Sequence, residues 1–394
     1  MALPFDRSEY EARIAAVQQE MARRGLDALV ISDPANMNYL TGYDGWSFYV
    51  PQAVILIGGE PQPYWFGRPQ DANGARLTTW LDDEHITSYP ETHIHQPDRH
   101  PMDIAAALLQ KLGCGAKKIG VEMDAYYFSA LSYARLTLHL PNARFEDATL
   151  LVNWKRIVKS PAELALMRKA ARIASNAMRI AREAIAVGQR EIDAAAAVYH
   201  AEIAGVDGIV GDYCSLAPLM PSNERTSASH LSAVDRRYAA GDAVNIELAG
   251  CHMRYHAPLA RTVSVGRPSQ RLAALGEAVT EGLNEALAAV RPGITCSDVE
   301  AAWRRVLTRH GFEKDSRLGY AVGVGYPPDW GEHTASLRAG DETVLVENMT
   351  FHAIAGMWLK DYGLEISETF AVGAKGVEVL TDFERGLLVV EGGD

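Results

Sequence analysis

The sequence lacks any long, uninterrupted apolar run. Its 394 residues contain no stretch of about 18 apolar side chains, so we expect no transmembrane helix. The first twenty residues, Met1 to Glu20, carry charges throughout and contain no apolar segment of the kind found in secretion signals. We therefore expect a cytoplasmic protein that does not act at a membrane.

Basic residues and paired cysteines are also scarce. The chain has 38 Lys and Arg against 50 Asp and Glu, and its net charge of −12 argues against a nucleic-acid partner, because phosphates attract a basic surface. Its four cysteines, Cys114, Cys214, Cys251 and Cys296, are scattered without a CxxC pair, which is typical of reduced thiols. Cys251 is a candidate nucleophile, but a small buried side chain is the favoured interpretation.

The first half of the chain alternates between helical and strand-like patterns. Short apolar runs at 28–32, 53–57 and 118–122 predict strands, and helical spacing at 10–24, 102–112 and 126–138 predicts helices between them. This alternation is typical of an α/β domain with a covered sheet, which we assign to residues 1–155.

The second half, residues 156–394, favours an α+β domain. Ser160-Pro161-Ala162-Glu163 is a capping box that begins a helix running to Gly188. Further helices are expected at 190–204, 270–290 and 296–310. Strands around 243–248, 260–265, 349–354 and 364–371 predict an antiparallel sheet with helices on one side.

One hairpin carries a family resemblance. Val244-Asn-Ile-Glu-Leu-Ala-Gly250 and Arg254-Tyr-His-Ala-Pro-Leu-Ala-Arg-Thr-Val-Ser-Val-Gly266 resemble the metal-binding hairpin of the pita-bread hydrolases, such as prolidase, aminopeptidase P and methionine aminopeptidase. The family has an Asp on the first strand and another eleven residues later, where this chain has Glu247 and Pro258. The resemblance implies a creatinase-like α/β N-terminal domain followed by an α+β pita-bread catalytic domain.

The other ligand positions of the family are changed as well. Its His, Glu and Glu ligands match Tyr320 in Gly319-Tyr-Ala-Val-Gly323, Ile354 in Phe351-His-Ala-Ile-Ala355 and Ser367 in Gly363-Leu-Glu-Ile-Ser-Glu368. One carboxylate in five positions cannot hold two hard divalent cations, which need several oxygen anions. We therefore expect no metal and no other cofactor, as in the metal-free branch of the family that contains creatinase, and a metal peptidase is excluded.

The remaining polar residues near these positions are candidates for the site. Side chains alternate along a strand, so His352 and Glu365, each two residues before a ligand position, should face the same cavity as Glu247. A solvated sheet edge is the alternative for Glu247, but Ile246 and Leu248 flank it as buried neighbours would. We predict Glu247 and Glu365 as catalytic residues.

His230 is the predicted proton-transfer group. It follows the loop Pro221-Ser-Asn-Glu-Arg-Thr-Ser-Ala-Ser-His230, where the resemblance places the acid–base histidine of creatinase. Imidazole suits this work because its pKa is near neutrality. The alternative is a loop histidine that hydrogen-bonds to the backbone.

The segment Tyr43-Asp-Gly-Trp-Ser-Phe-Tyr49 has four aromatic residues in seven. Glycine and polar residues interrupt it, so we do not expect it to join the core of its own domain. The family resemblance implies that an N-terminal loop reaches the active site of the partner in a homodimer. We predict Trp46 and Tyr49 as walls of a pocket for a compact cation; a plain aromatic cluster is the alternative.

Several segments in both halves resemble the ectoine hydrolases within this family. Among them are Ser32-Asp-Pro-Ala-Asn-Met-Asn-Tyr-Leu-Thr-Gly42, Tyr326-Pro-Pro-Asp-Trp-Gly-Glu332 and Asn348-Met-Thr-Phe-His352. The loop Asn223-Glu-Arg-Thr226 departs from that pattern and leaves room for a related substrate. The resemblance implies metal-independent opening of the cyclic amidine ring of ectoine to N-acetyl-2,4-diaminobutyrate, which a deacetylase partner would then process.

The expected substrate is a small zwitterion with a carboxylate and an amidinium. Arg317 or Arg254 is expected to bind the carboxylate, because Arg pairs with carboxylates through two parallel hydrogen bonds. Hydrolysis of creatine or another guanidino or amidino compound is the alternative function. A catalytically inactive domain is not favoured, since inward polar residues are kept. The other predicted substrate-binding residues are Tyr255, His256, Tyr320 and His352.

Overall fold

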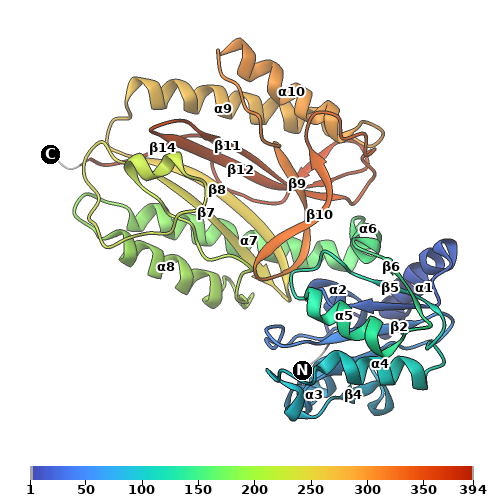
Figure 1. The fold of residues 1–394 in the computed structure, drawn as a ribbon. Helices are drawn as coiled ribbons and strands as arrows, with labels where there is room; N and C mark the ends of the chain where they lie inside the picture. The colour runs from blue at the N-terminus through green and yellow to red at the C-terminus, as the bar shows by residue number, and fades with distance from the viewer. Residues whose placement is uncertain (1–2, 393–394) are drawn as a thin grey trace. The chain divides into compact units, whose positions relative to one another are not determined.

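The computed structural model describes residues 3–392 and divides into two compact units. The N-terminal unit ends at Arg156, and the C-terminal unit begins at Ile157. Figure 1 shows the elements of both units, coloured along the chain.

The N-terminal unit contains a six-stranded mixed sheet in the order β4-β3-β2-β1-β5-β6. The central strand β1 runs antiparallel to β2 and parallel to β5. The strands are β1 (Ala28–Ile31), β2 (Ala53–Ile57), β3 (Tyr64–Gly67), β4 (Ile86–Ser88), β5 (Lys118–Val121) and β6 (Arg144–Asp147). The helices are α1 (Arg7–Arg24), α2 (Pro34–Thr41), α3 (Pro69–Thr78), α4 (Pro101–Lys111), α5 (Ala130–His139) and α6 (Leu151–Arg156), with short 3₁₀ turns η1 (Asp83–His85) and η2 (Glu91–His93).

Local signals in the sequence explain where these elements begin and end. Gly25 ends α1 because it adopts a left-handed conformation, with φ of 67°. Asp33 caps α2 by accepting a hydrogen bond from the Ala35 amide, and Pro34 occupies the first turn. The predicted strands that became β1, β2 and β5 are confirmed, whereas β3, β4 and β6 were not predicted.

The C-terminal unit is built on an eight-stranded sheet in the order β13-β12-β11-β9-β8-β14, with β7 paired to β8 and β10 paired to β9. Its pairings are antiparallel except that β14 runs parallel to β8. The strands are β7 (Ala243–His252), β8 (Tyr255–Val265), β9 (Gly319–Tyr326), β10 (Asp329–Leu337), β11 (Thr350–Trp358), β12 (Gly363–Val372), β13 (Val377–Val379) and β14 (Leu388–Val390). The helices are α7 (Pro161–Ala184), α8 (Glu191–Ala204), α9 (Gln270–Ala289) and α10 (Cys296–Arg309), with the 3₁₀ turn η3 (Asn223–Ser227).

Two helix pairs cover this sheet, one over each half (Figure 1). Apolar side chains of α7 and α8 form one core cluster with β7 and β8. Those of α9 and α10 form another with β9, β11 and β12. In β7, Ile246 and Leu248 belong to the first cluster, so Glu247 between them projects from the opposite face of the sheet.

Some boundaries differ from the predicted ones. Helix α7 ends at Ala184 rather than at Gly188, which lies in a turn with φ of 83°. Strands β7 and β8 are longer than predicted and meet at a two-residue turn of Met253 and Arg254, both with positive φ. Strands β9 and β10 were not predicted because glycine recurs throughout β9.

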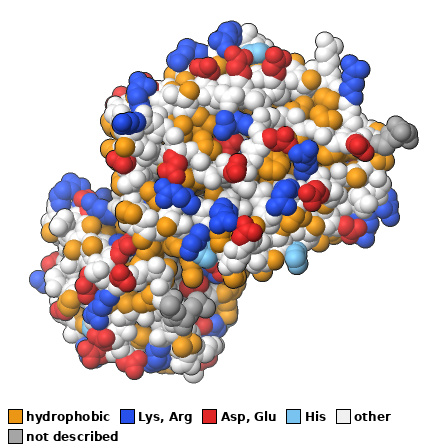
Figure 2. Space-filling model, turned by 180° about the vertical axis from the view of Figure 1, so that it is seen from behind, with side chains coloured by type: hydrophobic (Ala, Val, Ile, Leu, Met, Phe, Trp, Pro, Cys, Tyr) orange, Lys and Arg blue, Asp and Glu red, His pale blue; other side chains and the backbone are white. Residues whose placement is uncertain are grey.

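The surface mixes charges of both signs. On the face shown in Figure 2, Lys and Arg side chains are interspersed with Asp and Glu. Several are paired, such as Arg168 with Glu378 at 2.7 Å and Arg190 with Asp235 at 3.0 Å. Among residues 3–392, no helix is long and apolar enough to cross a membrane.

Helix α7 approaches β7 very closely at Gly250. A Cβ atom added there would lie 1.9 Å from the carbonyl oxygen of Ala170 and 2.6 Å from the amide nitrogen of Ala174. Both contacts are with backbone, which cannot rotate away as a side chain can. Glycine is therefore required for this helix to lie on the strand that carries Glu247.

Replacing Gly250 by Ala should destabilise the C-terminal unit. The added methyl group must push α7 away from β7, and overpacking of this kind costs about 3 kcal/mol. The matched control is Gly376→Ala, where the added Cβ would meet only the Val290 carbonyl at 3.8 Å. Thermal and urea unfolding followed by circular dichroism should show a large loss for Gly250→Ala and little change for the control. Equal stability of the two variants would contradict the close packing.

Candidate active site

Two glutamates from different strands meet on the inner face of the C-terminal sheet. Glu247 of β7 is 5% exposed, and Glu365 of β12 is 1% exposed. Burial, and then the negative charge of Glu365, raises the pKa of Glu247. The two side chains influence each other from the same side of the sheet, as strand alternation predicted, and their catalytic roles stay predictions.

Glu365 is held by several donors. Its Oε1 atom accepts hydrogen bonds from Trp358 Nε1 at 2.7 Å and from Asn245 Nδ2 at 3.3 Å. Asn245 lies two residues before Glu247 on β7, so the same strand supports both carboxylates. Thr262 on β8 fixes Asn245 by donating to its Oδ1 at 2.8 Å. This carboxylate is therefore both oriented and stabilised in its charged form.

Glu247 has a contrasting environment. Its backbone is anchored on both sides, pairing with Ala260 of β8 and exchanging hydrogen bonds with Leu219 at 2.8 and 2.9 Å. Its carboxylate, however, accepts no hydrogen bond from the residues that the structure describes, 3–392. A rigid backbone thus presents a carboxylate whose oxygens remain available to a ligand.

The two surroundings push the pKa values of the pair apart. Burial raises the pKa of Glu365 to about 7, against the opposing effects of Trp358, Lys314 and Asn245. Burial, Glu365 and Asp329 raise the pKa of Glu247 well above its ordinary value. We infer that the pair holds one proton at neutral pH. Because Glu365 accepts hydrogen bonds that stabilise its charged form, we assign this proton to Glu247. Such a division between two carboxylates is the pattern of acid–base chemistry.

His352 lies beside this pair in a hydrogen-bonded chain. Its Nε2 is 2.8 Å from Ser367 Oγ, and its Nδ1 is 3.2 Å from Tyr320 Oη. Trp330 Nε1 donates to the same Tyr320 oxygen at 2.9 Å. Burial, followed by the charge of Arg317, lowers the pKa of His352 to about 3, so this histidine is neutral. Tyr320 and His352 are therefore brought together, and their predicted role in binding substrate stays a prediction.

The donor set does not fit the pair of divalent cations that the pita-bread fold implies. At the five ligand positions, Pro258 and Ile354 offer no donor, and the Ser367 and Tyr320 oxygens already serve His352. Glu247 is the single anionic ligand among the five. Within residues 3–392, the one group of three His, Cys, Asp or Glu side chains near enough to share an ion is Asp82, Glu84 and His85, in the N-terminal unit.

Asp329, His333 and Arg317 form a further group around Glu247 and Tyr320. Asp329 Oδ2 on β10 lies 2.6 Å from His333 Nε2. After burial and Glu365, the negative charge of Asp329 also raises the pKa of Glu247. Burial opposes ionisation of Asp329, but the hydrogen bonds from His333 and from the Gly331 amide outweigh it, so its pKa is lowered. Arg317 lies over the Tyr320 ring at 4.4 Å. Asp329 and His333 were missed because β10 itself was not predicted.

Three other predicted substrate-binding residues are engaged by partners of their own, and of these His256 also lies 6.3 Å from the Trp330 ring. The Tyr255 hydroxyl donates to Glu163 Oε1 at 2.8 Å, on the face of β8 that packs on α7, so the structure does not bring it to Glu247. Burial lowers the pKa of His256 to about 3, and its two nitrogens are 2.9 Å from Arg254 O and 3.0 Å from the Ser215 amide nitrogen. Arg254 stacks on the Tyr213 ring at 3.5 Å and pairs with Asp212 at 3.6 Å.

His230 lies in an exposed loop after η3, with its Nδ1 3.0 Å from Ser229 Oγ. The start of this loop is tied to the site, because Thr226 accepts a hydrogen bond from Asn245 through its carbonyl and from the Gly363 amide through its hydroxyl. His230 therefore lies four residues after Thr226, which is buried and fixed by hydrogen bonds to β7 and β12. Its catalytic role stays a prediction.

The aromatic segment of the N-terminal unit is partly buried and partly exposed. Tyr43 and Phe48 are 3% and 6% exposed, so the expectation that the segment joins no core in its own domain is wrong for these two. Trp46 and Tyr49 are 54% and 63% exposed. Arg68 holds Tyr49 by donating to its hydroxyl at 2.9 Å. The role of Trp46 and Tyr49 as pocket walls stays a prediction.

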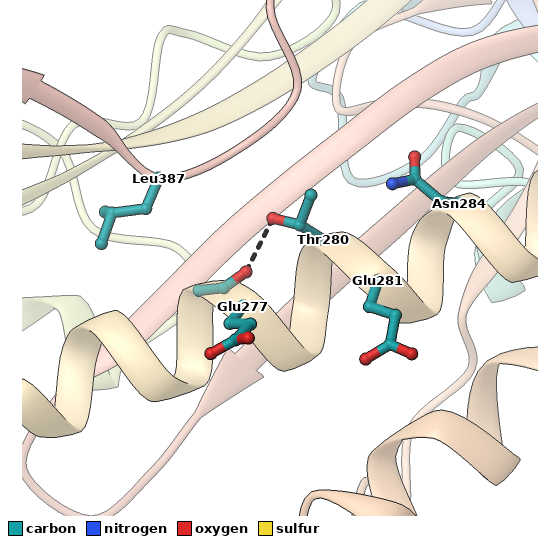
Figure 3. Close-up of a pocket in the computed structure, with 6 residues that line it drawn as sticks. Glu277, Thr280, Glu281, Asn284 and Leu387 are labelled. Atoms are coloured by element: carbon teal, nitrogen blue, oxygen red, sulfur yellow. Dashed lines mark hydrogen bonds between the residues drawn. The ribbon is translucent and has the colours of Figure 1, made fainter.

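A separate hollow of about 420 Å³ lies along α9 and is distinct from the carboxylate pair. Figure 3 shows its acidic side chains, Glu277 and Glu281, projecting from the helix on the side away from Leu387. Glu281 is already paired with Arg309 and with His310 Nε2 at 2.6 Å. Cys251, the candidate nucleophile of the hairpin, is fully buried, as favoured from the sequence.

Comparison with known proteins gives the family. Residues 165–374 match the metallopeptidase family M24, and residues 13–158 match the creatinase/prolidase N-terminal domain. The chain is 44% identical to the ectoine hydrolase of Halomonas elongata, over 99% of each chain. It is 45% identical to an uncharacterised hydrolase/peptidase of Sinorhizobium fredii, over 98% of this chain and 99% of that one.

A solved structure supports the fold. The prolidase of Pyrococcus horikoshii superposes with a TM-score of 0.80 at 23% identity, over 95% of this chain and 99% of that one. The predicted fold class, an α/β N-terminal domain followed by an α+β pita-bread domain, is confirmed. The chain belongs to the metallopeptidase family M24 and carries a creatinase/prolidase N-terminal domain.

Proposed function

We propose that this protein hydrolyses the cyclic amidine ring of ectoine to N-acetyl-2,4-diaminobutyrate. The proposal is supported by 44% identity to an ectoine hydrolase across essentially the whole chain. Within the structure, the observation that carries it is the buried pair Glu247 and Glu365, in which one carboxylate is held by donors and the other is free of them.

A planar amidinium cation is complementary to such a pair. Its ring N–H groups can donate to carboxylate oxygens, and its positive charge offsets the burial and the repulsion that raise the pKa of Glu247. Binding of the cation thus favours ionisation of both glutamates. Glu365, already oriented by Trp358 and Asn245, accepts one ring N–H, and Glu247 faces the amidine carbon.

The chemistry requires addition to that carbon and protonation of a ring nitrogen. Glu247 promotes the addition either as a nucleophile or as the base that takes a proton from water. In the water route, the hydroxide oxygen bonds to the amidine carbon, the ring C–N bond breaks, and the proton passes to the departing nitrogen. One amidinium and one water give one amide and one ammonium, so no net proton is consumed. We assign the proton transfer to His230.

The substrate carboxylate needs a cation. Arg254 is already engaged by Asp212 and by the carbonyl and ring of Tyr213. Arg317 is half-buried over Tyr320 and 3.3 Å from Ser336 Oγ, within the network around His352. We therefore favour Arg317 as the carboxylate-binding residue.

We also propose that the reaction needs no metal ion, because the five ligand positions supply a single anionic oxygen ligand. A homodimer is proposed on the two exposed aromatic side chains of Trp46 and Tyr49, which offer a surface for a partner's site. A cytoplasmic location is supported by four cysteines that remain free thiols. The acetylated product would suit a deacetylase as the next enzyme.

Purified protein should turn over ectoine faster than creatine, and Glu247→Gln should abolish most of this activity. Loss of a group that acts on the reacting carbon should lower kcat by about 10²–10⁴-fold. Glu202→Gln is the matched control, because Glu202 of α8 is also buried with a pKa raised to about 8 by burial. Product formation measured by chromatography should persist in this control. Creatine turnover above ectoine turnover would select the alternative substrate.

His230→Ala, measured in the same assay, should lower kcat much more than it raises KM, because proton transfer acts on the transition state. An unchanged kcat would return His230 to a structural loop role.

Turnover should survive removal of divalent ions. After dialysis against EDTA, activity and stability should match those of untreated protein, and elemental analysis should find no stoichiometric Zn, Mn, Co or Fe. Activity that is lost to the chelator and restored by Mn would overturn the argument from the donor set.

Mixed dimers should show whether the aromatic segment serves the partner's site. Trp46→Ala and Glu247→Gln should each be inactive as homodimers. After subunit exchange, random pairing would restore about a quarter of the sites, because each hybrid dimer contains one intact site. Absence of recovery despite exchange proven by mass spectrometry, or a monomer in solution, would place the segment elsewhere.

A further inference from the structure

Lys314 is a buried cation that the proposed reaction does not use. It lies in the loop between α10 and β9 and is 8% exposed. Its Nζ donates to the carbonyl oxygen of Gly356 and lies 4.6 Å from the centre of the Trp358 ring. Burial lowers its pKa to about 8, while the charge of Glu365 opposes that effect. Lys314 therefore remains mostly charged at neutral pH.

Trp358 connects this cation to the active site. One face of its indole receives the Lys314 ammonium, and its Nε1–H donates to Glu365 Oε1 at 2.7 Å. Gly356 pairs directly with Glu365 across β11 and β12. A Cβ atom at Gly356 would lie 2.6 Å from the indole ring, so the glycine leaves the space in which the ring lies.

The other charged groups around this arrangement do not replace Lys314. Arg304 of α10 donates to the Lys314 carbonyl, but its guanidinium is paired with Glu300. Glu313 and Asp315 are exposed neighbours of Lys314 in the chain. Toward the active site, the neighbouring charges are acidic: Glu365 lies near Glu247, whose pKa is raised by burial and by the charges of Glu365 and Asp329. Lys314 is the cation whose charge acts on Glu365.

We propose that Lys314 is a positioning residue that acts on Glu365 through the Trp358 indole and keeps this carboxylate ionised beside Glu247. A cation over an aromatic face withdraws electron density from the ring and strengthens its N–H as a donor. The same positive charge stabilises the Glu365 anion directly. The inference rests on the proposed function in one respect: the anionic Glu365 is the group that receives the substrate's amidinium.

The test follows the Trp358 indole N–H resonance in protein labelled with ¹⁵N-tryptophan, without substrate. Seven tryptophans give seven indole signals, and the one missing in Trp358→Phe is assigned to Trp358. In the parent protein, this resonance should titrate with a midpoint near the Glu365 pKa of about 7. A second inflection should appear near the Lys314 pKa of about 8.

Removing the charge should move the first midpoint upward. In Lys314→Met, and in Lys314→Gln, which keeps a donor for the Gly356 carbonyl, the midpoint should rise by about one pH unit, because an opposite charge at this range shifts a carboxyl pKa by that order. Lys314→Arg should leave it unchanged. Lys360→Met is the control, since it removes the same charge from an exposed position two residues after Trp358.

An unchanged midpoint in both uncharged variants, or an equal shift in Lys360→Met, would overturn the inference. If neither uncharged variant folds, the parent still decides, because an indole resonance that does not titrate between pH 5 and 10 would show that neither Glu365 nor Lys314 acts on Trp358. In the catalytic arm, the acid limb of the kcat/KM profile for ectoine should move by the same amount as the resonance. Shifted resonances without ectoine turnover would refute the proposed function and leave the role of Lys314 intact.

Discussion

The burial of Glu247 and Glu365 against each other is the constraint around which the C-terminal unit is organised. Two carboxylates in a low-dielectric interior cannot both ionise without a compensating cation. The structure meets this constraint asymmetrically: Trp358, Asn245 and Lys314 act on Glu365, whereas Glu247 has no donor among the described residues. The asymmetry separates the pKa values of the pair and leaves a site whose unmet requirement is positive charge. In the proposed reaction, the substrate cation meets that requirement, so its binding is linked to the ionisation of both glutamates.

The sheet holds the two carboxylates in place. Strand β7 is hydrogen-bonded to β8 on one side and to Leu219 on the other, so the position of Glu247 is determined by backbone pairing on both edges. Glu365 is fixed in the same way, because its amide donates to Thr262 Oγ1 and its strand pairs with β11. Close packing of α7 at Gly250 supports β7 from behind. Catalytic groups on paired strands lose little freedom when a ligand binds, which is the advantage of a site built on a sheet rather than on loops.

The parts of the site that could be predicted from the sequence are those governed by strand alternation. Once Glu247 was aligned with a ligand position, the period of two placed His352 and Glu365 on the same face, and the structure agrees. The same rule would have excluded Tyr255, which lies three residues from Pro258 and faces α7. Lys314 could not be predicted, because its contacts with Gly356 and Trp358 depend on how a loop crosses strands more than forty residues away. Strand β9 was not predicted because glycine recurs in it. At Gly319, a Cβ atom would lie 2.3 Å from the His352 carbonyl oxygen on the neighbouring strand β11.

Two of the family's metal-ligand positions, Tyr320 and Ser367, hold His352 in place by hydrogen bonds. Tyr320 accepts from Trp330 and contacts His352, and Ser367 accepts from the Ala260 amide while contacting the other side of the same imidazole. In the tautomer with the proton on Nε2, Tyr320 donates to His352 Nδ1 and His352 donates to Ser367, so each ring nitrogen has a partner. A satisfied buried network of this kind is rigid, whereas an incomplete one would be costly. Restoring the family's ligand at Tyr320 or Ser367 would therefore break this network before it rebuilt a metal centre. Under the proposed function, the scaffold keeps its fold while the carboxylate pair polarises the substrate in place of metal ions.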